Sequence, residues 1–223
     1  MRYLRLADII FSMHILTDCI RKCIITLTRI ILKLQFKIEV SGEENIPLQA
    51  SGTLIIANHS SYLDVFVIGR AFSQNVLNMR WVISKTNYNI WSLKWFYWVY
   101  RVIVVNGTVE KARKAIKENK WVVIFPEGAA RWCGNKNNIE SNRKSRGTAA
   151  IALSTGASII PVYIKGADQV LPPDSFTLKP QFTINVTIGK PFSFTPVNQE
   201  KIEESLLDKT TQEIFGRINA LNT

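Results

Sequence analysis

A histidine and an aspartate five residues apart are the side chains of this chain best suited to chemistry. They stand in the run Asn-His-Ser-Ser-Tyr-Leu-Asp at 58–64, directly after the apolar run 54–57. The chain has only two histidines, so the general base of any reaction near neutral pH falls to His59. If a helix begins at Ser60 or Ser61, a chain reversal there returns the Asp64 carboxylate to one imidazole nitrogen. The other nitrogen then faces a substrate hydroxyl, so the spacing predicts a His-Asp dyad.

A second motif, Phe-Pro-Glu-Gly at 125–128, follows the apolar run 121–124. Proline ends a strand and glycine permits an unusual backbone, so Glu127 is projected from the end of the strand. A tight turn with an exposed acid is the structural alternative. The presence of His59 elsewhere in the chain favours a functional role for this glutamate.

These residues require elements to position them, and short apolar runs alternate with helix-like segments along the chain. This alternation predicts an α/β fold with a mixed, largely parallel sheet that helices cover on both faces. Expected strands are 36–40, 53–57, 81–84, 102–105, 121–125, 159–164 and 182–188. Expected helices are 63–72, 89–100, 109–119, 145–155 and 199–221. His59 would then lie at a strand end, where catalytic residues of such folds usually sit.

The N-terminal segment 1–35 precedes the domain expected at 36–223 and differs from it. Charged residues interrupt its apolar residues at helical intervals, and no apolar stretch reaches the roughly 20 residues needed to span a bilayer. The pattern predicts one amphipathic helix, or a helical hairpin, lying in a membrane interface. Packing against the protein's own core is the alternative. The aromatic segment 90–101 is an equally open case, either a second membrane contact or a buried helix.

The formal net charge of +11 favours an anionic partner such as a nucleic acid, an acidic membrane surface or a phosphorylated substrate. Most of the six tryptophans cluster with apolar residues instead of alternating with lysines, which argues against nucleic acid. The three cysteines lack metal-ligand spacing, so we expect no metal site and a reduced, cytosol-facing location.

Together the two motifs resemble the glycerolipid acyltransferase family, which comprises the lysophosphatidate and glycerol-3-phosphate acyltransferases. That family carries Asn-His-x4-Asp followed by Phe-Pro-Glu-Gly, as at 58–64 and 125–128 here. Further similarities are Ile-Ser-Lys at 83–85, Arg-Gly at 146–147 and Ile-Pro-Val at 160–162. All blocks stand in the family's order over about residues 36 to 190, which implies the glycerol-phosphate acyltransferase-like fold.

The resemblance implies transfer of a fatty acyl group from an acyl thioester to a lysolipid hydroxyl, most simply that of 1-acyl-glycerol-3-phosphate. His59 would be the base and Asp64 its orienting partner, with backbone amides at the start of the next helix stabilising the oxyanion. No resident cofactor is expected. The donor co-substrate would be acyl-CoA or acyl-acyl carrier protein, and the enzyme would be monotopic, on the cytoplasmic face of a phospholipid membrane. The expected substrate-binding residues are Asn58, Lys85, Glu127, Gly128, Arg131 and Arg146.

Two departures from the family pattern bear on the acceptor. Asn106 stands where the family has an arginine, and Ala129-Ala130 replaces Thr-Arg after the second motif, so Arg131 comes one place late. Arg131, Arg143, Lys144 and Arg146 are candidate replacements, since a phosphate monoester needs paired donors and positive charge. A different lysolipid acceptor is the alternative. Two further hypotheses for the function are a His-Asp thioesterase and a non-catalytic membrane-binding protein.

Overall fold

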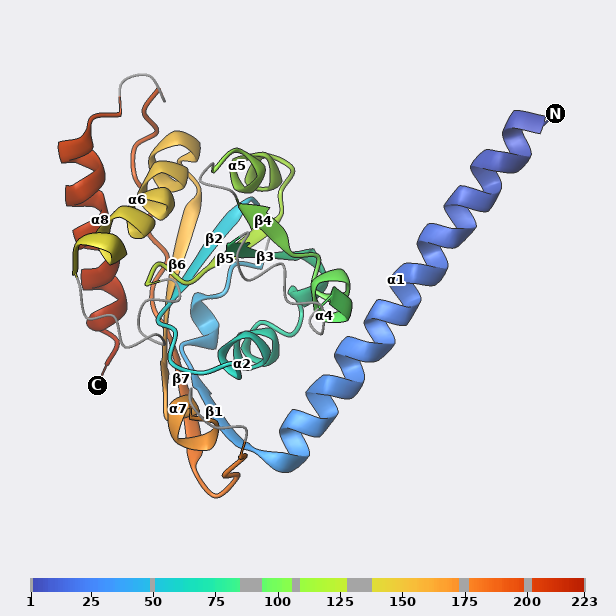
Figure 1. Cartoon of the computed structure of the whole chain (residues 1–223), viewed down its shortest axis with the longest axis horizontal. Coiled ribbons are helices and arrows are strands. Elements are labelled where there is room, and N and C mark those ends of the chain that lie inside the picture. The colour runs from blue at the N-terminus through green and yellow to red at the C-terminus, as the bar shows by residue number, and fades with distance from the viewer. Residues whose placement is uncertain are drawn as a thin grey trace.

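The computed structural model describes residues 2–48, 51–84, 94–105, 109–127, 138–172, 177–198 and 202–222. Seven strands form one central sheet (Figure 1). Across the sheet their order is β1 (Lys37–Ser41), β7 (Thr183–Ile188), β6 (Ser158–Lys165), β2 (Thr53–Ala57), β5 (Trp121–Ile124), β3 (Met79–Ser84) and β4 (Ile103–Val105). Every neighbouring pair is parallel except β6 and β7, which confirms the expected mixed, largely parallel sheet.

Helices cover both faces of the sheet, so its central strands are buried on both sides. On β2, Leu54 and Ile56 belong to the core cluster under α5 (Glu110–Lys117), α6 (Asn138–Thr155) and α8 (Glu204–Asn219). Ile55 and Ala57 belong to the opposite cluster, which includes the buried side chains of α2 (Asp64–Ala71) and α7 (Ala167–Val170). All five residues of β2 are buried, which explains why its sequence is continuously apolar instead of alternating.

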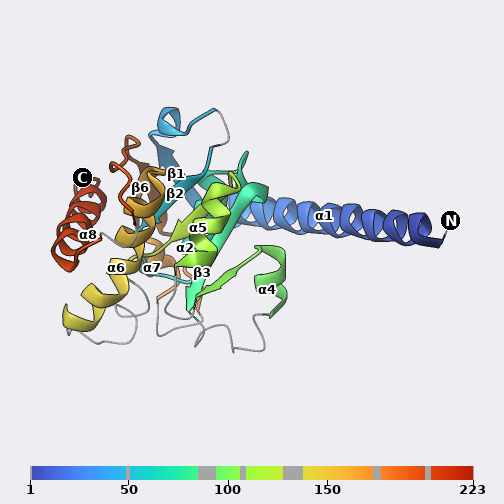
Figure 2. The same cartoon turned by 90° about the horizontal axis from the view of Figure 1, so that it is seen from above.

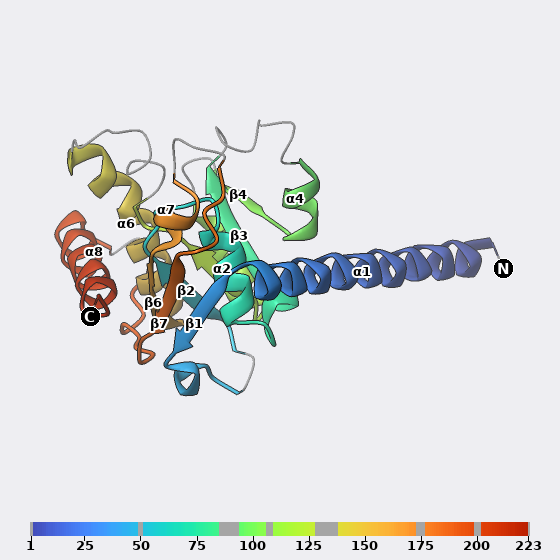
Figure 3. The same cartoon turned by 90° about the horizontal axis from the view of Figure 1, so that it is seen from below.

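The helix α1 (Arg2–Gln35) extends away from the rest of the molecule in all three views (Figures 1, 2 and 3). Its C-terminal half packs against the body, where Ile25 and Leu32 are buried, and it contacts α2, α4 (Lys94–Val99) and β1. The segment expected as one helix or a hairpin is therefore a single helix. Among the residues that the structure describes, no helix combines the length and the apolar character needed to cross a bilayer.

Several boundaries differ from those expected. Helix α6 begins at Asn138, seven residues before the expected start, and α2 begins at Asp64 instead of at the serine pair. Three short helical elements had no sequence signal, namely α7 and the 3-10 turns η1 (Glu43–Asn45) and η2 (Val76–Asn78). Of the helix expected at 89–100, residues 94–99 form α4, while 89–93 lie outside the described residues.

Candidate active site

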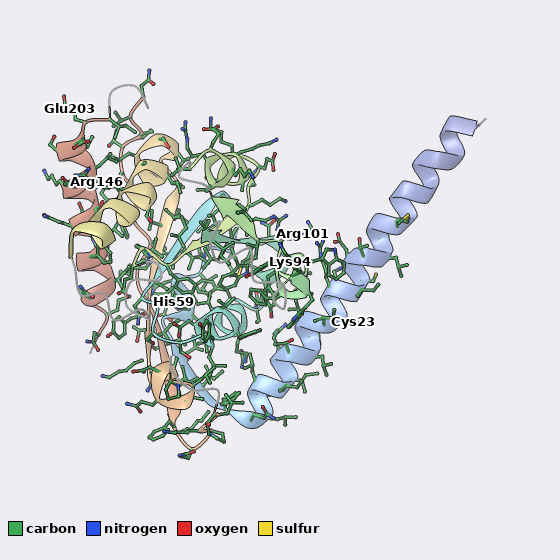
Figure 4. All side chains as sticks on the ribbon, viewed as in Figure 1. Cys23, His59, Lys94, Arg101, Arg146 and Glu203 are labelled. Atoms are coloured by element: carbon green, nitrogen blue, oxygen red, sulfur yellow. The ribbon has the colours of Figure 1, made fainter. Side chains whose placement is uncertain are left out.

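The two sequence motifs meet because β2 and β5 are parallel neighbours. Ile56 pairs with Ile124 in the sheet register, so both strands end at the same edge. His59 follows the end of β2, and Phe125 follows the end of β5 directly. Carboxyl ends of parallel strands are where an α/β sheet places its ligands. In Figure 4 His59 lies at this edge, beside α2.

His59 and Asp64 form a direct hydrogen bond. The His59 Nδ1 atom lies 2.8 Å from Asp64 Oδ2. Since an ionised carboxylate can only accept, Nδ1 carries the proton of the neutral imidazole and Nε2 is the basic nitrogen. The Asp64 side chain is fully buried, whereas that of His59 is 19% exposed. In this pair the carboxylate is therefore inaccessible to solvent, whereas the imidazole is partly accessible.

The loop between β2 and α2 is folded around the same carboxylate oxygen. Asp64 Oδ2 also accepts from the backbone N–H groups of Ser60, at 2.7 Å, and Ser61, at 2.8 Å. The Ser61 hydroxyl donates to the carbonyl of Leu171, just beyond α7, and accepts from the Leu63 amide. Two of the amides that we expected to face the oxyanion are thus bound to Asp64, because the chain turns back before α2 begins.

An aromatic stack holds the other side of the imidazole. The rings of His59 and Phe125 are nearly parallel, with centroids 4.2 Å apart and an interplanar angle of 18°. Phe125 stacks in turn on the buried Trp81 of β3, with centroids 6.4 Å apart. Sequence reasoning assigned no role to Phe125. The contact arises because Phe125 is the first residue after β5, the parallel neighbour of β2, and this pairing is known only from the structure.

The side chain of the buried Asn58 forms hydrogen bonds with the backbone of β6. Its side-chain amide donates to the Ile164 carbonyl at 2.8 Å, and its side-chain oxygen accepts from the Ile164 N–H at 2.7 Å. Only 3% of Asn58 is exposed. These contacts anchor the end of β2 immediately before His59.

Arg146 is not brought to His59. Its guanidinium makes a two-pronged hydrogen bond to Asp208 of α8, at 2.6 and 2.7 Å, and Glu204 lies 3.5 Å away. Figure 4 shows Arg146 on α6 beside α8, well separated from His59. The hydrogen bond to Asp208 raises the pKa of the Arg146 guanidinium, more than burial lowers it.

Four other expected site residues follow strand ends. Lys85, after β3, and Gly128 and Arg131, after β5, lie outside the described residues, as does Asn106. Glu127 is described and half-buried, two residues beyond Phe125. Among the described residues, no group of three His, Cys, Asp or Glu side chains is placed to hold a metal ion. The described chemistry is that of a base, its carboxylate partner and a neighbouring acid.

Comparison with known proteins adds a family and a fold. The model of a family described as Acyltransferase matches residues 37–165, more than half of the chain. A chloroplast 1-acyl-sn-glycerol-3-phosphate acyltransferase of Arabidopsis thaliana is 23% identical over 168 residues, which cover 70% of this chain and 44% of that protein. The namesake from Saccharomyces cerevisiae is 26% identical over 97% of this chain and 73% of its own length.

A relative from Borreliella burgdorferi with the same name is 31% identical, covering 57% of this chain and 51% of its own length. The chain thus spans about half the length of the Arabidopsis and Borreliella relatives. Among solved structures, the 1-acyl-sn-glycerophosphate acyltransferase of Thermotoga maritima superposes with a TM-score of 0.60 at 21% identity. That likeness covers 91% of this chain and 80% of the other, and it shows a shared fold.

Proposed function

The chain belongs to the acyltransferase family, and we propose that it transfers a fatty acyl group from an acyl thioester to a hydroxyl of a lysolipid. One observation supports this most directly: the 2.8 Å hydrogen bond between His59 Nδ1 and the fully buried Asp64 carboxylate. It presents a basic Nε2 at a solvent-reached strand edge, which is what deprotonation of a hydroxyl requires.

In the proposed reaction Nε2 of His59 takes the hydroxyl proton while the oxygen attacks the thioester carbonyl. The new carbon–oxygen bond forms, the carbon–sulfur bond breaks, and the proton passes from the imidazolium to the departing thiolate. Asp64 stabilises the imidazolium, and the Phe125 ring limits its rotation. No Gly-x-Ser-x-Gly elbow occurs in the chain, which favours direct transfer over a serine acyl-enzyme.

The acceptor we propose is 1-acyl-glycerol-3-phosphate, the substrate that the names of the similar proteins print. Glu127 would bind a free hydroxyl of the acceptor or hold a neighbouring arginine. Lys85, Gly128 and Arg131 remain proposed contacts of the acceptor or its phosphate. Arg146 is the weakest member of this set, because its guanidinium is bound to Asp208.

We further propose that α1 lies on a membrane, on the cytoplasmic face that a water-soluble acyl-CoA or acyl carrier protein can reach. Its described outer surface exposes large apolar side chains, namely Met13, Ile15, Leu16, Ile20, Leu27, Ile30, Ile31 and Leu34. A helix with this surface and basic flanks is typical of an interfacial membrane helix. Trp95 and Trp98 of α4 are also exposed, as expected for side chains at headgroup depth.

A screen of acceptors by mass spectrometry tests the proposal. Purified protein receives palmitoyl-CoA or palmitoyl-acyl carrier protein together with lysophosphatidate, glycerol 3-phosphate, other lysophospholipids and lyso-aminolipids. We expect phosphatidate from lysophosphatidate, with the rate lost in His59→Ala because the hydroxyl is no longer deprotonated. General base catalysis contributes roughly 10²- to 10⁴-fold.

Each other result has a distinct meaning. Acylation of another lysolipid alone would contradict the proposed acceptor and connect Asn106 and Ala130 to a changed specificity. Free fatty acid without an acylated product would favour a thioesterase. Unchanged acylation by His59→Ala would remove the dyad from the reaction.

A further inference from the structure

A pocket with an excess of positive charge lies where α1 meets α4 and the turn before β3. The side chains of Asp18, Arg21, Lys22 and Arg101 line it, together with apolar residues of the body such as Val99. Figure 4 shows Arg101 between α4 and α1, far from Arg146 and apart from His59. None of the expected site residues belongs to this pocket, so the acyl-transfer chemistry does not account for its charges.

In this pocket the Asp18 carboxylate accepts hydrogen bonds from two guanidinium groups, those of Arg21 and Arg101. Arg21 donates through Nη1 to Asp18 Oδ1 at 3.2 Å, and Arg101 donates to the same oxygen. The Nε and Nη2 atoms of Arg21 donate to the carbonyl of Trp98 at the end of α4. Burial favours a raised pKa for Asp18, but the hydrogen bonds and charges of Arg101 and Arg21 outweigh it and lower the pKa.

Two further cations, Arg80 and Lys22, belong to the surroundings of Arg21 and Arg101. Burial lowers the pKa of the Arg80 guanidinium, and the positive charges of Arg101 and Arg21 lower it further. Lys22 lies exposed on α1 at the rim. Glu118 and Asp18 act on Arg80 in the opposite direction. The pocket itself is lined by three cations, Arg21, Lys22 and Arg101, and one carboxylate, Asp18, so it has a net positive charge.

The backbone at Arg101 is held in a conformation that favours glycine. Its φ is +48°, one of only two positive φ values at non-glycine residues in the described chain. This conformation caps the end of α4, where the Val102 N–H donates to the Tyr97 carbonyl. The cap places the Arg101 guanidinium beside α1, where it reaches Asp18.

The surroundings identify the kind of ligand. The Arg21 guanidinium lies 4.8 Å from the ring centroid of Trp98, an exposed side chain of the type that prefers the headgroup level of a bilayer. Exposed Leu16 and Ile20 of α1 lie within a turn of Asp18 and Arg21. Cationic and aromatic groups thus meet beside a helix whose opposite side exposes apolar side chains, a combination suited to the surface of an anionic bilayer.

We propose that this pocket binds the phosphate of an anionic phospholipid headgroup and thereby fixes the body of the protein against the bilayer. Lys22 and Arg101 supply donors, Arg21 supplies charge, and Asp18 is the internal anion that the phosphate must displace. This inference rests on the proposed membrane placement of α1. It does not depend on acyl transfer.

Sedimentation with vesicles tests the pocket. The full chain is mixed with phosphatidylcholine vesicles that contain or lack phosphatidylglycerol. The test variant is Lys22→Ala with Arg101→Gly, because glycine fits the φ of +48° without strain. The control is Lys190→Ala with Lys209→Ala, two exposed lysines that lie outside this pocket. We expect the test variant to bind phosphatidylglycerol vesicles about 25-fold more weakly, about fivefold per cation, and the control to bind like wild type.

Asp18→Asn gives a test of opposite sign. Removing the internal anion should strengthen binding to phosphatidylglycerol vesicles several-fold, whereas mere damage to the α1–α4 contact would weaken it. Equal losses in the test and control variants would replace the pocket with diffuse surface charge. Inorganic phosphate that abolishes the preference at constant ionic strength would make free phosphate the ligand and overturn the lipid assignment.

The same experiment separates this inference from the proposed function. Wild-type protein that binds both vesicle types without preference would overturn the pocket but leave the membrane placement intact. Wild-type protein that binds neither would overturn both. Acyl transfer in detergent, measured on the same preparations, reports on His59 independently of these outcomes.

Discussion

Asp64 receives three hydrogen bonds on one oxygen, from the imidazole and from two backbone amides. The carboxylate therefore fixes the conformation of the loop and the orientation of His59 at once. Its other oxygen, Oδ1, is buried and has no hydrogen-bond partner among the described residues. This difference between the two carboxylate oxygens determines how a substitution of Asp64 affects activity and stability.

For Asp64→Asn, the sequence alone suggests a loss of rate through the wrong imidazole tautomer. The geometry gives a different reason. The amides of Ser60 and Ser61 need an acceptor, so the asparagine oxygen takes the place of Oδ2 and preserves the tautomer, while the negative charge is lost. We expect kcat to fall roughly 10²-fold, with a loss of stability because the new NH2 group is buried without an acceptor.

Steady-state kinetics of Asp64→Asn beside His59→Ala, together with thermal melting, measure this prediction. An unchanged kcat in the asparagine variant would show that the charge of Asp64 takes no part in turnover. A loss as large as that of His59→Ala would instead indicate a misoriented imidazole.

Sequence reasoning predicted the dyad because His59 and Asp64 are close in the chain, so local spacing limits where they can go. It did not predict the bond between Asn58 and Ile164, since 106 residues separate them and no periodic pattern links them. The contact of His59 with Phe125 also depends on which strands are neighbours, which the sequence does not state.

At the scale of elements, Asn58 joins the ends of β2 and β6. Asn58→Ala would leave a buried N–H and a buried carbonyl of Ile164 without partners. We expect it to lower the free energy of unfolding by about 2–4 kcal/mol and to displace His59. Urea denaturation measures the change, and Asn45→Ala, which removes one bond to the Ile188 carbonyl, is the milder control.

Two results would contradict this view of Asn58. Full stability with lost acylation would restore the substrate contact that the motif suggests. Full stability with full activity would show that another group satisfies Ile164.

The contact between α6 and α8 depends on pH through Asp208. The hydrogen bond from Arg146 lowers the pKa of Asp208 below its ordinary value of 3.8, although burial acts in the opposite direction. Because the folded-state pKa is depressed, the contribution to stability is present above the unfolded value near 3.8 and is lost as the pH falls through the folded value.

We therefore expect Asp208→Asn to melt at a lower temperature than wild type at neutral pH, and the difference to vanish as the pH falls below the ordinary value of 3.8 and through the lowered pKa of Asp208. Thermal melts across this range provide the measurement. Glu213→Gln is the matched control, because it removes a carboxylate of α8 whose partner Arg217 lies on the same helix. A difference that persists in acid would assign the effect to packing.

The central strands β2, β5 and β6 were predictable because each contains a short apolar run, as expected for strands buried on both faces, whereas β1 and β7 show the alternation of strands with one exposed face. The early part of α6 and the four-residue α7 were not predictable. Residues 138–144 contain a single apolar residue, Ile139, and so have no apolar period, and α7 is only four residues long with two buried residues. A local pattern of apolar residues therefore does not predict either segment.

At the scale of the whole molecule, α1 presents an apolar surface that the body leaves uncovered. We expect the triple variant Leu16→Gln, Ile20→Gln and Leu27→Gln to fold normally, because these side chains are exposed. Its binding to phosphatidylcholine vesicles should fall at least about tenfold, because each leucine or isoleucine loses apolar burial in the bilayer. Flotation with vesicles measures binding, and circular dichroism checks the fold.

Leu178→Gln is the control for this prediction, since Leu178 is an exposed leucine of the body just before β7. Unchanged binding of the triple variant would remove α1 from the membrane. Equal losses in both proteins would indicate that exposed apolar side chains bind vesicles wherever they lie.

The pairing of β1 with β7 has a consequence for synthesis on the ribosome. Lys37 of β1 pairs with Thr183 of β7, so β1 cannot pair with its neighbour among the described strands until β7 has been synthesised. At roughly 5–20 residues per second, that wait lasts on the order of ten seconds. Throughout it, α1 has already emerged with its apolar surface exposed. The nascent chain therefore displays its apolar helix well before its sheet can be completed, and the bilayer can capture it while the rest is still being translated.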